Sequence, residues 1–170
     1  HLVRTTDSTG YNSGATTYDL NGNALTVTDA NGNVTSYTYD ALGRTTAITD
    51  PNGGVTRTEY DHNGNVIKTG DAESNVTVYT YDALNRLTEY TDAEGYTFSF
   101  QYDAEGNMPA STDGNGNTTR YTYDRLNRAV SSVNAEGNAA VNSYDADGNI
   151  VRSVNEEGAE TVYTYDAEGR

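Results

Sequence analysis

The sequence predicts an all-β protein made of tandem hairpins, because one short motif recurs with a constant period. The dipeptide Tyr-Asp occurs eight times, and each copy follows the previous one by 21 residues. A strict period of this length is typical of stacked supersecondary units. The tyrosines are Tyr18, Tyr39, Tyr60, Tyr81, Tyr102, Tyr123, Tyr144 and Tyr165, and the aspartates are Asp19, Asp40, Asp61, Asp82, Asp103, Asp124, Asp145 and Asp166.

Residues 18–38 show how one unit is organised. Residues 19–23 and 29–33 have the composition of tight turns, and residues 24–28 and 34–38 have that of strands. Gly or Asn always stands at the fifth position from the Tyr, and the fifteenth position is Gly except at Ser74. Both positions suit a positive φ, while the Asp that opens each turn accepts hydrogen bonds from the amides that follow it. Each unit is therefore predicted to be a hairpin, and successive hairpins should form a curved or spiralling antiparallel sheet, a solenoid-like wall, tube or shell.

Composition narrows the functional class. The 170 residues have a formal net charge of -15, and Leu, Ile, Val and Phe together number only 25. Such a balance is typical of disordered proteins, but Tyr, Thr and Val at fixed positions favour a half-buried pleated sheet. The presence of only ten Lys and Arg residues in an acidic sequence argues against nucleic acid as a partner. We expect no membrane insertion, because no apolar run reaches the length of a span.

Aromatic residues two positions apart on one strand share a face of the sheet. Tyr37 and Tyr39 form such a pair, as do Tyr79 and Tyr81. We expect the resulting aromatic stripe to pack between neighbouring units, together with Val and Leu side chains. A ladder of rings that binds a ligand is the alternative interpretation.

A second period of 42 residues appears in the turns. Those that open at Asp40, Asp82 and Asp124 each carry Leu and end in Arg, whereas the turns between them end in Gly-Asn. The arginines are Arg44, Arg86 and Arg128, and the leucines are Leu42, Leu84 and Leu126. Each Arg should lie beside the Asp of its own turn. The resulting charge ladder would keep the sheet in register while adding little stability.

The domain organisation follows from the period. We expect residues 1–170 to form a single array of about eight units, and to be a fragment or repeating segment of a longer protein. Near the start of the sequence the spacing between equivalent turns is 22, which predicts a β-bulge between Tyr11 and Thr17. The first residues lack the apolar core of a signal peptide, so any targeting segment is expected outside this sequence.

The repeat resembles the YD repeats of the RHS family. Segments such as Tyr39-Asp-Ala-Leu-Gly-Arg-Thr and Tyr81-Asp-Ala-Leu-Asn-Arg-Leu-Thr carry the resemblance, which extends over nearly the whole sequence. It implies a long spiralling antiparallel sheet. In bacterial polymorphic toxins and insecticidal toxin complexes of this family, that sheet closes into a shell around a toxic polypeptide, and a similar shell belongs to the ectodomain of teneurins. Nothing here matches the self-cleavage segment that ends the RHS core.

Candidate sites for chemistry are few. His62 is the only internal histidine and is interpreted as a turn residue. Asp145, Asp147 and Asn149 resemble the start of a calcium loop, but the rest of that motif is missing. Three glycosylation sequons begin at Asn33, Asn75 and Asn117 and repeat every 42 residues.

The predicted function is structural. We expect a non-catalytic scaffold without cofactors in a secreted or cell-surface protein. Calcium bound by Asp145, Asp147 and Asn149 is the alternative to an ordinary turn at these residues. The scaffold would form an extracellular fibre, filament or tube wall through self-association or continuation of the same array. One alternative is part of a toxin-encapsulating shell, and another is an adhesin that binds carbohydrate or a receptor.

Overall fold

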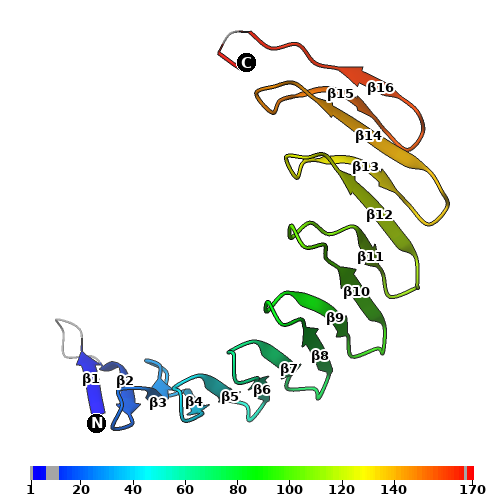
Figure 1. The fold of residues 1–170 in the computed structure, drawn as a ribbon. Coiled ribbons are helices and arrows are strands. Elements are labelled where there is room, and N and C mark those ends of the chain that lie inside the picture. Colours follow the sequence, from blue (N-terminus) through cyan, green and yellow to red (C-terminus); the bar gives the residue numbers. More distant parts are fainter. Residues whose placement is uncertain (1, 7–11, 167) are drawn as a thin grey trace. The chain divides into compact units, whose positions relative to one another are not determined.

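The computed structural model describes residues 2–6, 12–166 and 168–170. These residues form strands and turns and no helix, so the predicted all-β class is confirmed (Figure 1). None of them belongs to a helix with the length and hydropathy that a membrane span requires. The strands are β1 (Leu2–Thr6), β2 (Asn12–Tyr18), β3 (Ala24–Thr28), β4 (Val34–Tyr39), β5 (Thr45–Thr49), β6 (Val55–Tyr60), β7 (Val66–Gly70), β8 (Val76–Tyr81), β9 (Leu87–Thr91), β10 (Thr97–Gln101), β11 (Ala110–Thr112), β12 (Thr118–Tyr123), β13 (Ala129–Val133), β14 (Ala139–Tyr144), β15 (Ile150–Val154) and β16 (Glu160–Val162).

The protein divides into two compact units. The first comprises residues 1–85 and 92–94, and the second comprises residues 86–91 and 95–170. The first unit contains β1 to β8 and the second contains β9 to β16. Within each unit the strands follow sequence order, and each strand pairs antiparallel with its neighbours in the sequence (Figure 1). The tandem hairpin repeat is therefore confirmed, whereas a single array over residues 1–170 stays a prediction.

Strand pairing is regular except across Tyr-Asp turns, where the strand that follows the turn carries a bulge near its start. Between β4 and β5, Thr38 pairs with Ala47 and Tyr39 pairs with Thr45, so Thr46 has no partner in the register. The same shift recurs after Tyr18, Tyr60, Tyr123 and Tyr144. Such bulges increase the local twist of a strand. The sequence pattern did not predict them.

The predicted irregularity near the start of the sequence is also a bulge. Thr5 pairs with Gly14 and Thr6 pairs with Asn12, which leaves Ser13 as the extra residue. Gly14 has a φ of 139°, and a Cβ atom at this position would lie 2.6 Å from the carbonyl oxygen of Thr28. The bulge therefore lies within the predicted range, and it depends on a glycine beside it.

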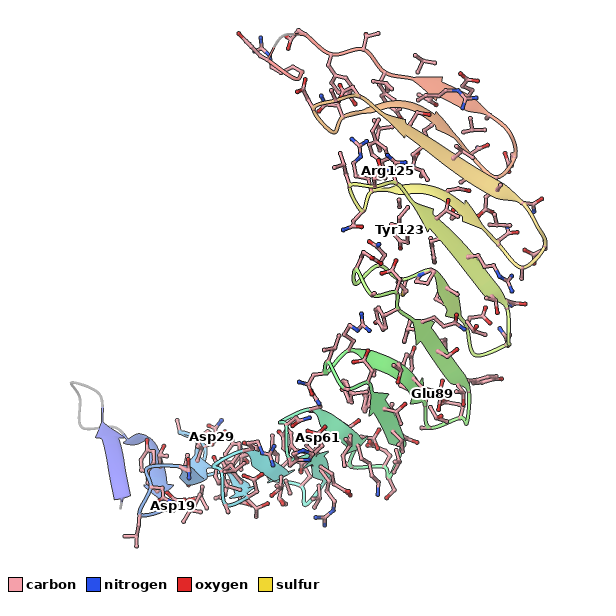
Figure 2. The ribbon with its side chains drawn as sticks, in the orientation of Figure 1. Asp19, Asp29, Asp61, Glu89, Tyr123 and Arg125 are labelled. Carbon is pink, nitrogen blue, oxygen red and sulfur yellow. The ribbon has the colours of Figure 1, made fainter. Side chains whose placement is uncertain are left out.

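Each unit consists of one layer of sheet, and burial is correspondingly shallow. Among the described residues, only Ala47 and Ala110 are buried hydrophobic residues, at 9% and 8% exposure. Leu42 and Leu84 are 73% and 70% exposed, so the expectation that neighbouring units bury Leu faces is wrong for these turns. Most tyrosines are half-buried. Because the described residues place no second layer on either face, lateral contacts along the sheet can cover only part of each residue (Figure 2).

Candidate functional site

The Tyr-Asp turns, which begin at the aspartates of the eight motifs, share one hydrogen-bond scheme. In the turn from Asp40 to Arg44, the Asp40 amide donates to the Arg44 carbonyl at 3.0 Å, and the Gly43 amide donates to the Asp40 carbonyl at 3.0 Å. The Asp40 carboxylate oxygen Oδ1 accepts the amides of Leu42 and Arg44 at 2.9 and 3.0 Å. Gly43 has a φ of 76°. These contacts form a type I turn closed by a residue in the left-handed region, a standard three-residue hairpin connection.

The same scheme tolerates asparagine where glycine is absent. Asn85 and Asn127 have φ values of 61° and 59°, and Ser74 has 70° in a turn at the other end of the strands. All eight Tyr-Asp turns therefore have a positive φ at the fifth position, as the sequence predicts. The positive-φ residues of these turns are Gly22, Gly43, Gly64, Asn85, Gly106, Asn127, Gly148 and Gly169.

Hydrogen bonds lower the pKa values of the turn carboxylates of Asp19 and Asp40. At Asp19 the largest cause of the lowered pKa is the side-chain amide of Asn23, which donates to Oδ2 at 2.9 Å, and the backbone amide of Asn23 adds to the effect. At Asp40 the backbone amide of Arg44 is the largest cause of the lowered pKa. Because these bonds favour the ionised form, the carboxylates of Asp19 and Asp40 are held as anions and close their turns.

Arginine side chains connect alternate Tyr-Asp turns to the next turn along the sheet. The Arg44 Nε atom donates to Asp40 Oδ2 at 2.6 Å, while Nη1 donates to the carbonyl of Asp61 at 2.9 Å. The guanidinium carbon also lies 4.6 Å from the ring centroid of Tyr60. We call this set of contacts an arginine bridge.

Two further arginine bridges lie in the second unit. Arg86 donates to the carbonyl of Asp103 at 3.2 Å, and Arg128 donates to the carbonyl of Asp145 at 3.0 Å. Each guanidinium carbon again lies 4.6 Å from a tyrosine ring centroid, that of Tyr102 or Tyr144 respectively. The expected pairing of Arg with its own Asp is present for Arg44 and Arg128. The contact with the following turn was not expected.

Side-chain amides connect two of the intervening pairs of turns. Asn63 and Asn65 donate to Asn85 Oδ1 at 3.1 and 2.8 Å, and Asn107 donates to Asn127 Oδ1 at 3.1 Å. We call these contacts amide bridges. Together with the arginine bridges, they alternate along the turns, which gives the 42-residue period of the sequence a physical basis.

The motif tyrosines reach backward along the sheet. Tyr39 donates its hydroxyl to the carbonyl of Ala24 at 2.9 Å, fifteen residues earlier, and Tyr123 donates to that of Met108 at 3.0 Å. The acceptor lies directly after the preceding Tyr-Asp turn. Equivalent bonds are made by Tyr60, Tyr81, Tyr144 and Tyr165. Among the described rings, close aromatic stacking joins Tyr90 to Phe98, with centroids 4.5 Å apart, and Tyr90 to Phe100, at 6.2 Å.

The sequons lie in the turns at the other end of the strands. Asn33, Asn75 and Asn117 are exposed, and each donates its side-chain amide to the carboxylate of the Asp that opens its turn, at 2.7 to 3.0 Å. These bonds explain the repeated Asn without a glycan. Glycosylation at these positions stays an untested alternative.

The candidate calcium residues belong to one Tyr-Asp turn. Asp145 accepts the amides of Asp147 and Asn149 at 3.0 and 2.8 Å through Oδ1, and the Asn149 side chain through Oδ2 at 2.9 Å. Both carboxylate oxygens thus close the turn. Within the residues that the structure describes, no group of three His, Cys, Asp or Glu residues could hold a metal ion. Calcium at this turn stays an untested alternative.

Comparison with known proteins identifies the family. The family model described as "RHS Repeat" matches residues 18–56, 60–97, 81–117, 102–139 and 144–170, most of the sequence. The chain belongs to the RHS repeat family. A search of curated proteins finds no match.

Comparison with solved structures finds large toxin proteins. A Tc holotoxin pore from Photorhabdus luminescens, with a mutation in TccC3, aligns at a TM-score of 0.65 and 19% identity, over 83% of this RHS repeat chain and 9% of the toxin chain. A crystal structure of TcdB2-TccC3-Cdc42 aligns at a TM-score of 0.43 and 17% identity, over 99% of this chain and 14% of that one. The holotoxin similarity establishes a shared fold. The RHS repeat chain spans a small part of the length of either protein.

Proposed function

We propose that this RHS repeat chain is a non-catalytic structural element, a segment of wall in a larger secreted or cell-surface protein. The observation that carries this proposal is the lateral network of the Tyr-Asp turns. Arginine and amide bridges bond turns to their successors, and the motif tyrosines add bonds between successive units. A sheet held together in this way can be extended by adding units, since each unit depends on its neighbours.

A shell that encloses a toxic polypeptide is the form of wall that we favour. The support is the fold shared with the Tc holotoxin protein, of which this RHS repeat chain would match a short stretch. A one-layer sheet suits such a role because one face can line a chamber while the other faces solvent. In this setting the partner is a continuation of the same array, and the turns carry the stiffness of the wall.

A fibre or filament is the second candidate. It is favoured by the Tyr-Asp spacing of 21 residues, which is kept without an insertion from Tyr18 to Tyr165. Uniform units generate a helix of constant pitch when they are added repeatedly, whereas a closed shell has to change curvature at its ends. The two candidates share the scaffold role and differ in how the array ends.

Electron microscopy of the full parent protein separates these proposals. A shell predicts discrete hollow particles of uniform size, and the parent gene should continue into a self-cleavage segment and a toxin domain. Long rods whose length increases with protein concentration would support the fibre and contradict the shell. The scaffold role would be refuted if the repeat region of the parent protein had a catalytic activity of its own. That activity would have to be lost when single turn residues are substituted while the protein stays folded.

A further inference from the structure

Five turns contain an asparagine followed directly by a positive-φ glycine. These asparagines are Asn21, Asn31, Asn52, Asn63 and Asn115. We propose that they are sites of spontaneous covalent modification, in which Asn becomes aspartate or isoaspartate, and that the amide bridge to Asn85 protects Asn63. This inference does not depend on the wall function.

The chemistry requires only the polypeptide and water. The backbone nitrogen of the glycine, after losing its proton to hydroxide, attacks the Cγ atom of the preceding Asn. A new C–N bond closes a five-membered succinimide, the original bond from Cγ to Nδ2 breaks, and the Nδ2 group takes a proton from water and leaves as ammonia, which regenerates the hydroxide. Water then opens the ring at either carbonyl and yields an aspartyl or isoaspartyl residue. Glycine favours the attack because it has no Cβ to hinder the ring.

The turn geometry opposes this reaction in the folded protein. In a type I turn the backbone of the third residue directs the next nitrogen away from its side chain, so the turn has to open before the ring can close. The relevant bond joins the glycine amide to the carbonyl of the Asp that opens the turn. Its length is 3.4 Å for Gly22, 3.1 Å for Gly32 and Gly53, and 2.9 Å for Gly116.

Asn21 and Asn63 form a matched pair within the first unit. Both stand in Tyr-Asp turns of the form Asp-x-Asn-Gly-Asn, and their glycine bonds are similarly long, at 3.4 Å for Gly22 and 3.3 Å for Gly64. Both residues are exposed. Their side chains differ, because Asn63 Nδ2 donates to Asn85 Oδ1 at 3.1 Å. The Asp61 carbonyl of the Asn63 turn also accepts Arg44 Nη1 at 2.9 Å, a contact that variants at Asn85 leave in place. Within the described residues, the side chain of Asn21 makes no hydrogen bond.

This difference determines which asparagine reacts first. Cyclisation needs free rotation of the Asn side chain about its Cα–Cβ bond, and the amide bridge holds the Asn63 side chain in place. We therefore expect Asn21 to react fastest, Asn31 and Asn52 to follow, and Asn63 to lag despite its long glycine bond. Each isoaspartyl product adds one carbon to the backbone inside a turn, which displaces the groups that close it.

Peptide mapping by mass spectrometry tests the proposal. The purified folded protein is incubated at mildly alkaline pH, and the deamidated fraction of each peptide is followed over time, in parallel with a sample in concentrated urea. Asn21 should react several-fold faster than Asn63 in the folded sample, and the two rates should converge in urea. Equal rates in the folded sample would overturn the role of the bridge. Absence of product at all five sites, with reaction in urea, would overturn the claim that the folded turns are modified.

Two variants at one position sharpen the test. Asn85→Gly removes the Oδ1 acceptor but keeps a residue suited to positive φ, as in most other Tyr-Asp turns, and should raise the Asn63 rate toward that of Asn21. Asn85→Asp keeps an acceptor and tolerates the same backbone, so Asn63 should stay protected. Asn115 serves as the internal reference, because its turn lies in the other unit. An Asn63 rate that does not respond to Asn85→Gly would refute the proposal.

Discussion

Replacement of Arg128 by methionine should remove one arginine bridge while preserving much of the length and the apolar stem of the side chain. Arg128 Nη1 donates to the Asp145 carbonyl at 3.0 Å, and its guanidinium carbon lies 4.6 Å from the Tyr144 ring centroid. It also pairs with Asp124 at 2.7 Å. All three contacts end with Arg128→Met, so the two turns that it joins should separate more easily.

The magnitude follows from the two contacts that cross between turns. A hydrogen bond from a charged donor to a partly exposed carbonyl contributes about 1 kcal/mol, and a cation–π contact at a partly exposed site adds about 0.5 to 1 kcal/mol. The ion pair with Asp124 lies within one turn and adds little. We therefore expect the free energy of unfolding to fall by about 1.5 to 2 kcal/mol in the unit that contains Arg128.

Arg125 provides a matched control in the same turn. Its side chain, labelled in Figure 2, is exposed. Among the described residues it makes no hydrogen bond or ion pair. Arg125→Met removes the same charge from a protein of net charge -15, so both variants change the overall electrostatics equally. Its effect should stay within about 0.5 kcal/mol.

Urea denaturation followed by circular dichroism measures the comparison. The midpoint of Arg128→Met should fall well below those of the parent and of Arg125→Met, and hydrogen exchange should accelerate at the amides of Asp124 and Asp145, which close the two turns. If the two variants share one midpoint and one exchange pattern, the bridge does not stabilise the sheet. The lateral network would then lose its main support.

Three further predictions test other parts of the network. Tyr123→Phe removes the hydroxyl bond to the Met108 carbonyl and should lower the free energy of unfolding by about 0.5 to 1.5 kcal/mol in the same denaturation assay. Gly43→Asn should add an amide bridge, because a Cβ at this position would lie 3.6 Å from Asn23 Oδ1. Since Asn tolerates the φ of this position, we expect the free energy of unfolding to rise by about 0.5 kcal/mol. A fall in the free energy of unfolding would contradict this prediction. Asp19 has a folded pKa below its ordinary 3.8, chiefly because of the hydrogen bond from the Asn23 side chain. The stabilisation that the Asp19 carboxylate contributes is therefore present above about pH 5 and is lost as the pH falls through the folded pKa. Acid titration followed by circular dichroism would detect this loss as unfolding.

The turns could be predicted from the sequence because their information is local. Asp40 reaches amides only two and four residues later, and a glycine or asparagine at the fifth position supplies the positive φ. Ser74 shows that the turn persists where glycine is replaced, since its φ is 70°. Pro51 fits the same logic, because the second position of a type I turn favours proline. Strand boundaries follow once the turns are known.

The lateral contacts could not be predicted because they depend on register across strands. Arg44 and the Asp61 carbonyl are 17 residues apart, and Tyr39 and the Ala24 carbonyl are 15 apart. Such contacts between residues far apart in the sequence form only once the strands that separate them have paired in register. The sequence does signal the alternation of turns, but it does not reveal that Arg44 bonds beyond its own turn. Burial was overestimated for a related reason, since the pattern does not show whether a second layer covers the sheet.

The position of the strong contacts explains how an acidic protein with few large apolar residues keeps an ordered sheet. Only two small hydrophobic residues are buried in the described part of the protein, so the apolar core of an ordinary domain does not supply the specificity. The turns supply it instead, because arginine and amide bridges start and end at the same turns that the aspartates close. The turns of Asn23 and Gly43 occupy the place of an amide bridge in the 42-residue period, but Gly43 has no side chain to make one. Stability in such a sheet should therefore behave as a sum over neighbouring turns, and the loss of one bridge should loosen two turns and leave distant ones unchanged.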